Sequence, residues 1–400
     1  KGVFHFMLNK QYTNMLQEKD VIFEIFQYAT ERAKVVGAEN IYDFSLGNPS
    51  VPAPSIVNET IVQKVKTLDP LALHGYSPSF GIMETREKIA ASLNKKYGSA
   101  YKAANIFMAI GAAGALAHAL RAVTNPGDEI ITFAPCFSEY KPYTAGAGLK
   151  LTIIPADIDT FQINFAAFEA QLNENVSAVL INSPNNPSGI VYSTETIEKL
   201  SSILTAKSKE FHHPIYLISD EPYRDIIFVG VDAPYIANYY KNTLTCYSFS
   251  KSISLPGERI GYLAVHPDCS DADKIIEICP QISRTIGQNG AASLMQRTVA
   301  DVCGCTSDLS VYETNKKILF EALREYGYHC VEPGGTFYMF PRSLEPDSQA
   351  FCKKAMEKDL MLVPGDIFGC PGHFRIAYCV PTQRVEKALP VFKELAEEYR

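Results

Sequence analysis

The chain has 400 residues, of which 46% are hydrophobic and 20% are charged, so it is long enough for two or three domains and its composition excludes a mostly disordered protein. Its 37 basic and 44 acidic residues give a net charge of −7, which provides no electrostatic reason to expect nucleic acid or an anionic membrane as a partner. No apolar run reaches the ~18 residues that cross a bilayer, and the apolar stretch within residues 1–6 is too short for a signal peptide, so we expect a cytoplasmic protein.

The first 43 residues and the long middle part of the chain have different patterns. Residues 11–43 predict a helical lead-in. From about residue 84 to 265, short buried-type apolar runs alternate with helical or turn-like segments. These runs are residues 106–110, 129–133, 149–154, 178–181, 215–219, 244–248 and 260–265. They predict an α/β fold with a seven-stranded, mostly parallel sheet that is covered by helices and forms one large domain.

The chain after residue 266 predicts an α+β region. Residues 271–326 have a helical pattern that is interrupted near residue 303, and two short strand-like segments follow at 336–340 and 374–379. The apolar face of a final amphipathic helix consists of Val385, Leu389, Phe392, Leu395 and Tyr399. We expect this region to pack with the N-terminal segment. The predicted division is a large domain of residues 55–300 and a small domain of residues 1–54 and 301–400.

The spacing of cysteine and histidine argues against a disulfide scaffold and against a metal site. Ten cysteines are scattered over residues 136–379, only Cys303 and Cys305 are close in sequence, and no C-x-x-C pair occurs. His212 and His213 are adjacent, so in a strand their rings point to opposite faces. We therefore expect reduced, mostly buried thiols and no metal ligand set.

A lysine flanked by hydroxyl residues follows one of the apolar runs. It is Lys251, in the segment S-F-S-K-S that begins at Ser248, and Arg259 comes eight residues later between glycine- and proline-rich turns. A lysine amine can form a Schiff base with a carbonyl compound, and an arginine can bind a phosphate. Taken alone, the motif would be interpreted as a surface lysine in a loop. With its neighbours it suits an anionic carbonyl cofactor.

Three further polar segments follow predicted strands. Asp220 and Tyr223 belong to D-E-P-Y, and Asn186 lies in S-P-N-N-P-S-G. The small residues G-A-A-G, from Gly111, lead from a strand into a helix, whose free amides can bind an anion. This turn is neither a Walker A loop nor G-x-G-x-x-G. Because the carboxyl ends of parallel strands share one edge of a sheet, we expect these segments to meet there. Each of them alone could equally be a loop or a strand-end cap.

The order of these motifs resembles one family. The segments S-P-N-N-P-S-G, D-E-P-Y, S-F-S-K-S, G-E-R-I-G and F-R-I-A follow each other along the chain, and the resemblance extends from residue 46 to 376. The chain is similar to fold type I pyridoxal-phosphate enzymes of the aspartate aminotransferase family, class I and II. The resemblance implies pyridoxal 5′-phosphate as cofactor and an amino acid and a 2-oxo acid as substrates.

The resemblance also implies roles for single residues. Lys251 would form the Schiff base with the cofactor and move a proton during the reaction. Asp220 would pair with the protonated pyridine nitrogen, and Tyr223 and Asn186 would bind the 3′-oxygen of the ring. The cofactor phosphate would be bound by Ser248, Arg259 and the amides that follow Gly111, namely those of Ala112 and Ala113. Phe137 would stack on the ring.

Two features depart from the family pattern. The chain contains no tryptophan, so Phe137 must take the place of the ring-stacking tryptophan of the best-known branch. Ala112 and Ala113 stand where relatives have acidic or hydroxyl residues. The first phosphate-binding loop would therefore act through backbone amides.

The resemblance assigns a further set of residues to the substrate and to a second subunit. Arg375 would bind the substrate α-carboxylate as a bidentate pair, together with the backbone of Gly47 and with Asn186. Tyr76 would reach the phosphate of the neighbouring subunit, so we expect a homodimer with shared active sites. Arg284 lies where acid-selective relatives place a second arginine that crosses the dimer. Its position is equally typical of an arginine that caps a helix end.

The cofactor residues leave the reaction open between two enzyme classes. The first is an aminotransferase, for which Arg284 favours aspartate or glutamate as donor and 2-oxoglutarate as acceptor. The alternative is a pyridoxal-phosphate lyase, such as a C–S β-lyase, which would share every cofactor residue. A DNA-binding regulator on the same fold would need an extension with a helix-turn-helix, and residues 1–44 carry no such signature.

Overall fold

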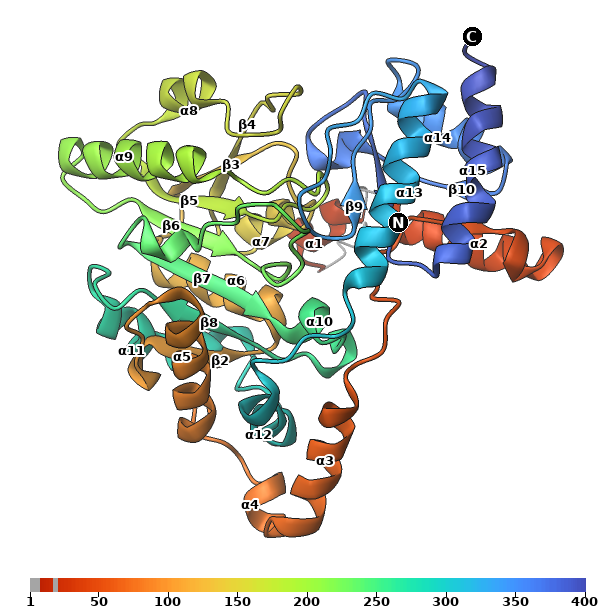
Figure 1. Cartoon of the computed structure of the whole chain (residues 1–400). Coiled ribbons are helices and arrows are strands. Elements are labelled where there is room, and N and C mark those ends of the chain that lie inside the picture. The colour runs from red at the N-terminus through yellow and green to blue at the C-terminus, as the bar shows by residue number, and fades with distance from the viewer. Residues whose placement is uncertain (1–7, 17–20) are drawn as a thin grey trace, which may run out of the picture.

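The structure is a computed structural model that describes residues 8–16 and 21–400. Its centre is a seven-stranded sheet in the order β2-β8-β7-β6-β5-β3-β4, in which only β8 runs antiparallel to its neighbours (Figure 1). The strands are β2 (Ile106–Ala109), β3 (Glu129–Phe133), β4 (Lys150–Ile154), β5 (Val176–Asn182), β6 (Tyr216–Asp220), β7 (Thr243–Ser248) and β8 (Gly261–Val265). The predicted seven-stranded, mostly parallel sheet is confirmed.

Side chains alternate between the two faces of the sheet along each strand, and helices cover both faces, so both sets of side chains are buried. In β5, Ala178 and Leu180 belong to one hydrophobic cluster, while Val179 and Ile181 belong to another. The first cluster includes helices α6 (Gly111–Ala122) and α11 (Ala272–Ile286). The second includes α8 (Phe165–Gln171) and α9 (Thr194–Glu210). A strand that is buried on both faces needs apolar residues at successive positions, which explains the continuous apolar runs in the sequence.

Other helices flank the sheet at its β2 edge and near the carboxyl ends of its strands. They are α3 (Ser55–Thr67), α4 (Pro70–His74), α5 (Met83–Tyr97), α7 (Tyr140–Ala145), the single turn α10 (Phe249–Ser252) and α12 (Ser293–Val302). Helices α3 and α4 extend away from the sheet as an arm (Figure 1).

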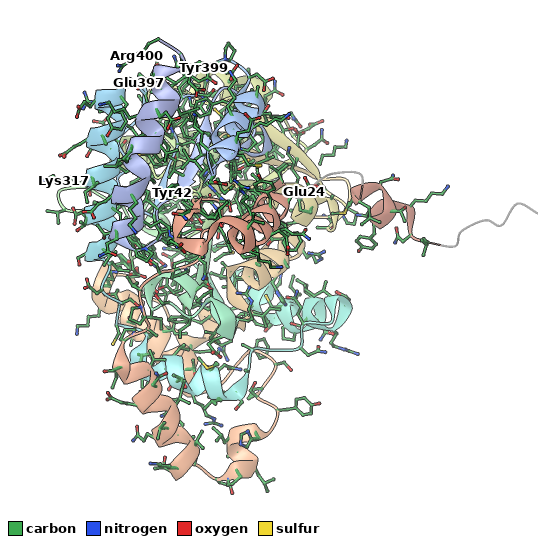
Figure 2. The ribbon with its side chains drawn as sticks, turned by 90° about the vertical axis from the view of Figure 1, so that its right-hand side faces the viewer. Glu24, Tyr42, Lys317, Glu397, Tyr399 and Arg400 are labelled. Atoms are coloured by element: carbon green, nitrogen blue, oxygen red, sulfur yellow. The ribbon has the colours of Figure 1, made fainter. Side chains whose placement is uncertain are left out.

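The two chain ends build a second region. Its helices are α2 (Val21–Val36), α13 (Ser310–Tyr326), α14 (Ser348–Glu357) and α15 (Thr382–Glu397). Helix α1 (Lys10–Met15) instead contacts α7, where Gln11 donates a hydrogen bond of 3.2 Å from Nε2 to the carbonyl oxygen of Ala145. Strands β1 (Tyr42–Asp43) and β10 (Leu360–Met361) form a parallel pair, and β11 (Val363–Pro364), β12 (Phe374–Ala377) and β9 (Tyr338–Met339) form an antiparallel sheet. Figure 2 shows Glu24 and Tyr42 in the same part of the molecule as Glu397 and Arg400.

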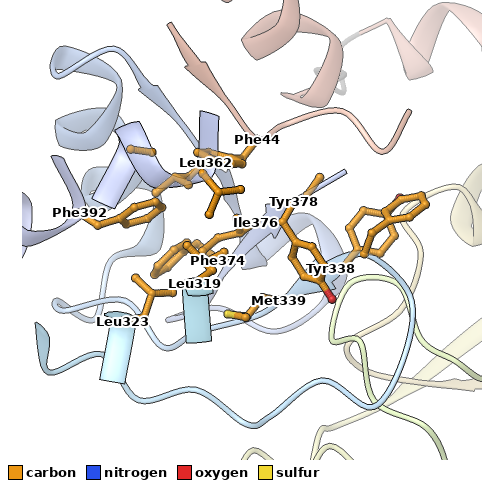
Figure 3. Packing of buried hydrophobic residues seen from close by; sticks show 14 of the residues in the cluster. Phe44, Leu319, Leu323, Tyr338, Met339, Leu362, Phe374, Ile376, Tyr378 and Phe392 are labelled. Atoms are coloured by element: carbon orange, nitrogen blue, oxygen red, sulfur yellow. The ribbon is translucent and has the colours of Figure 1, made fainter. Parts of the chain in front are cut away.

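One hydrophobic cluster ties the N-terminal segment to the C-terminal helices. Phe44, from the N-terminal segment, packs with Phe374 of β12, Leu319 of α13 and Phe392 of α15 (Figure 3). The rings of Phe44 and Phe392 are 6.1 Å apart. Burial of such aromatic side chains stabilises the region by about 1.5 to 3 kcal/mol each. The predicted packing of both chain ends against each other is therefore observed, while the domain boundaries stay a prediction.

Element boundaries differ from expectation in a few places. The segment 271–326 is broken twice rather than once, because α11 also ends at Gly287, whose φ is +69° and whose left-handed backbone cannot continue a helix. The predicted strand at 336–340 is reduced to Tyr338–Met339. The segment 1–6, used in the signal-peptide prediction, lies outside the described residues.

Three chemical findings concern the described residues as a whole. None of their helices combines the length and the apolarity that crossing a membrane requires. Within residues 8–16 and 21–400, His, Cys, Asp and Glu side chains form no group of three or more that could hold a metal ion. All ten cysteines are free thiols, and Cys305 is exposed.

Candidate active site

A cavity of about 300 Å³ lies at the carboxyl ends of the central strands. It is lined from the sheet side by Asp220 at the end of β6 and by Ser248 at the end of β7. From the second region it is lined by Gly47, Tyr338 and Arg375. A cavity of this size accommodates a small cofactor or metabolite.

Lys251 lies in the single turn α10, directly after β7. Its Nζ lines the cavity region and donates a hydrogen bond of 2.7 Å to the carbonyl oxygen of Gly47. Burial lowers the pKa of Lys251 to about 8, and the positive charges of Arg375 and Arg259 act in the same direction. About a tenth of the amine is therefore neutral at pH 7 and able to act as a nucleophile, far more than for an ordinary lysine.

Asp220 ends β6 and is only 4% exposed. Tyr140 donates a hydrogen bond of 2.7 Å from its hydroxyl to Oδ2, whereas Oδ1 has no partner among the described residues. Burial raises the pKa of Asp220 to about 7, although the hydrogen bond from Tyr140 opposes this shift. A buried carboxylate oxygen without a donor is costly. Asp220 is therefore prepared to accept a proton or a hydrogen bond from a cationic group in the cavity.

The opposite end of the cavity offers donors for an anion. Helix α6 begins at Gly111 and points its first amides toward the cavity, where Ala112 and Ala113 form part of the wall. Ser248 Oγ lies 2.6 Å from Ser250 Oγ, and both residues line the cavity.

Arg259 completes this anion end. It has a left-handed backbone with φ of +49°, lines the cavity, and donates from Nη1 to the carbonyl oxygen of Pro256 at 2.8 Å. A Cβ added to Gly111 would lie 3.2 Å from Nη2 of Arg259. Gly111, whose φ is +75°, therefore lets the guanidinium approach the start of the helix closely.

Arg375 is on β12 and is only 2% exposed. Its Nη1 donates a hydrogen bond of 3.0 Å to Oδ1 of Asn186, and its Nη2 donates one of 2.5 Å to the carbonyl oxygen of Ser45. Its Nε has no partner among the described residues. These bonds hold the guanidinium in one plane and leave donor capacity for a carboxylate.

Two predicted residues lie outside this cavity. Tyr76 is fully exposed, on a loop that is held in place because Gln296 bonds the hydroxyl of Ser77 at 2.9 Å and the amide of Ile82 at 2.8 Å. Arg284 is exposed in the last turn of α11, where its Nη1 donates 3.0 Å to Oε1 of Gln281. The cavity lining thus includes the other predicted residues except Gly111, which directly precedes Ala112 of the wall, and it includes neither Tyr76 nor Arg284.

The side walls of the cavity are apolar and aromatic. Phe137 lies in the cavity wall, with its ring 5.8 Å from that of Tyr140 in an edge-to-face arrangement. Ile22 of α2, Leu46 and Tyr143 complete this lining.

Sequence reasoning did not identify Tyr140 or Tyr338. Tyr140 contacts Asp220, and the Tyr338 hydroxyl lies 3.1 Å from the hydroxyl of Tyr223. Tyr140 had a signal, since it stands three residues after Phe137. Tyr338 had none beyond a short apolar strand.

The arrangement combines four functions in one small space. A neutralisable amine and a carboxylate with a free oxygen lie between an anion-binding end and a buried arginine. This set suits a phosphorylated, ring-containing cofactor that carries a basic nitrogen, together with a carboxylate substrate.

Comparison with known proteins agrees with this chemistry. Residues 39–392 match the family described as aminotransferase class I and II. An aspartate aminotransferase from Thermotoga maritima is 30% identical over 371 residues, which cover 90% of this chain and 93% of that protein. A probable aspartate aminotransferase from Methanocaldococcus jannaschii is 28% identical, over 94% of this chain and 96% of its own.

Solved structures give the same result. A crystal structure of an amino transferase from Eubacterium rectale is 46% identical, covers 99% of this chain and 100% of its own, and superposes with a TM-score of 0.96. The structure of the Thermotoga maritima aspartate aminotransferase is 27% identical, covers 97% and 99%, and gives a TM-score of 0.86. The fold and the family resemblance predicted from the sequence are confirmed: the chain belongs to the class I and II aminotransferases.

Proposed function

We propose that the cavity binds pyridoxal 5′-phosphate and that the enzyme transfers the amino group of an acidic amino acid to a 2-oxo acid. The observation that carries this proposal is the free Oδ1 of buried Asp220, in a cavity that also holds Lys251. A protonated pyridine nitrogen is the partner that this oxygen requires. When bound, the cofactor supplies an electron sink for negative charge at the substrate carbon next to the amino group.

Each residue of the sheet side then has a defined task. Lys251 provides the Nζ that attaches the cofactor and afterwards moves a proton. Asp220 stays ionised because a cation beside it lowers its pKa again. Tyr223 and Asn186 donate to the ring oxygen. Phe137 covers one face of the ring and excludes water.

The anion end would bind the cofactor phosphate. The amides of Ala112 and Ala113, the hydroxyl of Ser248 and the guanidinium of Arg259 supply the donors. Because the loop lacks hydroxyl side chains, each backbone amide supplies one donor, and the remaining phosphate oxygens depend on Ser248 and Arg259.

The substrate is bound by groups of the second region. Arg375 binds the α-carboxylate through its planar fork, and Gly47 offers its backbone beside it. The carbonyl oxygen of Gly47 accepts a hydrogen bond from Lys251 Nζ, and with Lys251 bound to the cofactor it would be able to accept one from the substrate amine instead. The apolar side of Ile22 and Leu46 shields this end from water.

The acidic donor depends on a second copy of the chain. Tyr76 and Arg284 are exposed here, so they can serve a cavity only across a subunit interface. We propose a homodimer in which Tyr76 reaches the partner's phosphate site and Arg284 reaches the side-chain carboxylate. Relatives that are named aspartate aminotransferases support this choice. The ten free thiols suit a reducing, cytoplasmic environment.

A panel of amino donors tests the substrate proposal. In single half-reactions, aspartate and glutamate should change the absorbance spectrum of the bound cofactor faster than alanine or phenylalanine does. Addition of 2-oxoglutarate should restore the original spectrum. Release of pyruvate and ammonia from cysteine or cystathionine without a 2-oxo acid would instead identify a lyase. The relatives named above are aminotransferases, which favours transamination.

The variant Arg284→Leu tests the source of acid selectivity. A carboxylate pair in a closed site contributes about 1.5 to 3 kcal/mol, so aspartate and glutamate should lose roughly 10- to 100-fold in kcat/KM, with alanine little changed. Arg324→Leu is a matched control, since Arg324 is an exposed arginine in the last turn of α13. An unaltered donor profile in Arg284→Leu would exclude the acidic-substrate proposal and leave the cofactor proposal intact.

A further inference from the structure

Tyr338 of β9 contacts both Tyr223, which is assigned to the cofactor, and Arg375, which is assigned to the substrate. It is 3% exposed and lines the cavity. Its hydroxyl is 3.1 Å from that of Tyr223, and its ring lies 4.8 Å from the guanidinium carbon of Arg375. We propose that Tyr338 is a positioning residue that strengthens the hydrogen bond from Tyr223 to the cofactor and fixes the plane of Arg375 for the substrate carboxylate. This inference rests on the proposed function and adds a residue to it.

The position of the Tyr338 hydroxyl is fixed by close packing against Gly47. A Cβ added to Gly47 would lie only 1.8 Å from this hydroxyl oxygen. Gly47 in turn accepts the hydrogen bond from Lys251 Nζ through its carbonyl oxygen. Any side chain at position 47 would therefore displace Tyr338, and the tyrosine cannot move away from Tyr223 without a change in the cavity wall.

The hydroxyl pair has a defined direction once an acceptor is bound. Either hydroxyl can donate in the structure. When Tyr223 donates into the cavity, its oxygen is free to accept from Tyr338. Hydrogen bonds in such a chain polarise each other, so Tyr223 becomes the stronger donor. Burial keeps both groups protonated, because it raises the pKa of Tyr338 to about 12 and that of Tyr223 well above its usual value.

The ring of Tyr338 acts on Arg375 separately from the hydroxyl. The guanidinium is flanked by the rings of Tyr338 at 4.8 Å and Phe368 at 4.9 Å. Its Nη1 and Nη2 bond Asn186 and Ser45. Stacking of this kind restrains the plane of the fork, and a bidentate carboxylate pair requires that plane to be correct.

Few other titratable groups face Tyr338. They are Tyr223 and Arg375, Lys251, whose Nζ lies 5.6 Å from the neighbouring ring of Phe337, and Cys379. Burial raises the pKa of Cys379 to about 12, so this thiol stays neutral near neutral pH. If removal of the Tyr338 hydroxyl changes the titration midpoint of the bound cofactor, the change therefore reports on the hydrogen bond between Tyr338 and Tyr223.

The test compares cofactor-loaded wild type with Tyr338→Phe and Tyr338→Leu. A donor to the ring oxygen stabilises its negative charge and lowers the pH at which the neighbouring nitrogen loses its proton. Tyr338→Phe should raise the midpoint of the absorbance titration by about 0.5 to 1 pH unit, the range that one hydrogen bond supports. Its affinity for maleate, a non-reacting dicarboxylate, should stay within about 3-fold of wild type, because the ring on Arg375 remains.

Tyr338→Leu removes the ring as well. It should show the same shift of the midpoint and, in addition, bind maleate about 10-fold more weakly. Tyr378→Phe is the matched control, because Tyr378 is fully buried in the same hydrophobic cluster and its hydroxyl has no partner among the described residues. This control should match wild type in both readouts.

Two outcomes bear directly on the inference. An unchanged midpoint in Tyr338→Phe, or an equal shift in Tyr378→Phe, would overturn it. Should Tyr338→Leu fail to fold in a thermal unfolding measurement, Tyr338→Phe alone decides, since it preserves the packing. A wild-type protein that binds no pyridoxal phosphate would instead contradict the proposed function itself.

Discussion

The two walls of the cavity are built in different ways. The sheet wall carries Asp220, Ser248 and Lys251 at the ends of neighbouring strands β6 and β7. The opposite wall carries Gly47, Tyr338 and Arg375. Gly47 comes from the N-terminal segment and the other two residues come from the C-terminal part of the chain, and they meet because both chain ends share one hydrophobic region. In the proposed function, sheet topology thus positions the residues assigned to the chemistry, while tertiary packing positions the arginine assigned to the substrate.

This difference predicts different consequences of mutation. Residues of the sheet wall should control the reaction or cofactor binding and leave the affinity for carboxylates largely intact. Residues of the opposite wall should control that affinity and leave the cofactor absorbance intact, with the one exception of the Tyr338 hydroxyl, which contacts Tyr223. Variants on the two walls test whether the two sets of effects can be separated.

The largest effect is expected from Lys251→Ala. Loss of the amine removes both the attachment point and the proton carrier, so kcat should fall about 10³- to 10⁴-fold or more, while pyridoxal phosphate can still bind without a covalent link. Steady-state assays and absorbance spectra measure the two effects. Lys241→Ala, two residues before the start of the same strand β7, serves as control. Turnover within 10-fold of wild type would assign the proton transfer to another residue.

Asp220→Asn should have opposite effects on activity and on stability. Loss of the carboxylate should lower kcat by about 10²- to 10⁴-fold, because the ring nitrogen loses its counter-ion. In the cofactor-free protein, however, the same change removes a buried charge and should raise the free energy of unfolding by about 1 to 3 kcal/mol at pH 8.

The pH dependence of this stability gain has a defined sign. The folded-state pKa of Asp220 is raised to about 7, so the proton bound in the folded wild type stabilises it below the unfolded pKa, and that contribution is lost as the pH rises through about 7. The gain from Asp220→Asn should therefore grow between pH 4 and 7 and level off above. Denaturant titrations at several pH values check this, and a gain independent of pH would show that folding does not raise the pKa of Asp220.

Arg375→Leu tests the opposite wall. Loss of the charge-assisted pair should weaken binding of amino and 2-oxo acids about 10- to 100-fold, with the cofactor absorbance retained. Arg375→Lys keeps the charge without the planar fork and should recover only part of the affinity. A loss of cofactor equal to the loss of carboxylate affinity would show that the two walls are not separable.

Tyr140→Phe is expected to have the smallest effect. It removes the hydrogen bond to Oδ2 of Asp220 but keeps the edge-to-face contact with Phe137. Turnover should fall by about 3- to 10-fold, as one hydrogen bond of roughly 1 kcal/mol predicts. A loss as large as that of Asp220→Asn would mean that Tyr140 is essential for the charge state of the carboxylate.

The same division explains what the sequence could predict. The seven strands were readable because two-sided burial leaves continuous apolar runs, and Asp220 and Lys251 could be located because they follow such runs directly. Tyr338 could not be found, because its two-residue strand gives no pattern and its contact with Tyr223 spans 115 residues. Tyr76 and Arg284 stay predictions, since a subunit interface leaves no periodicity that identifies its partner.

The central claim is that the strand-end residues form one cofactor site around Lys251. The most direct measurement is reduction of the pyridoxal-phosphate-loaded enzyme with borohydride, followed by proteolysis and mass spectrometry of the labelled peptide. We expect a single stoichiometric adduct on Lys251 and no such adduct in Lys251→Ala. A major adduct on any other lysine, or no adduct in the wild-type protein, would contradict it.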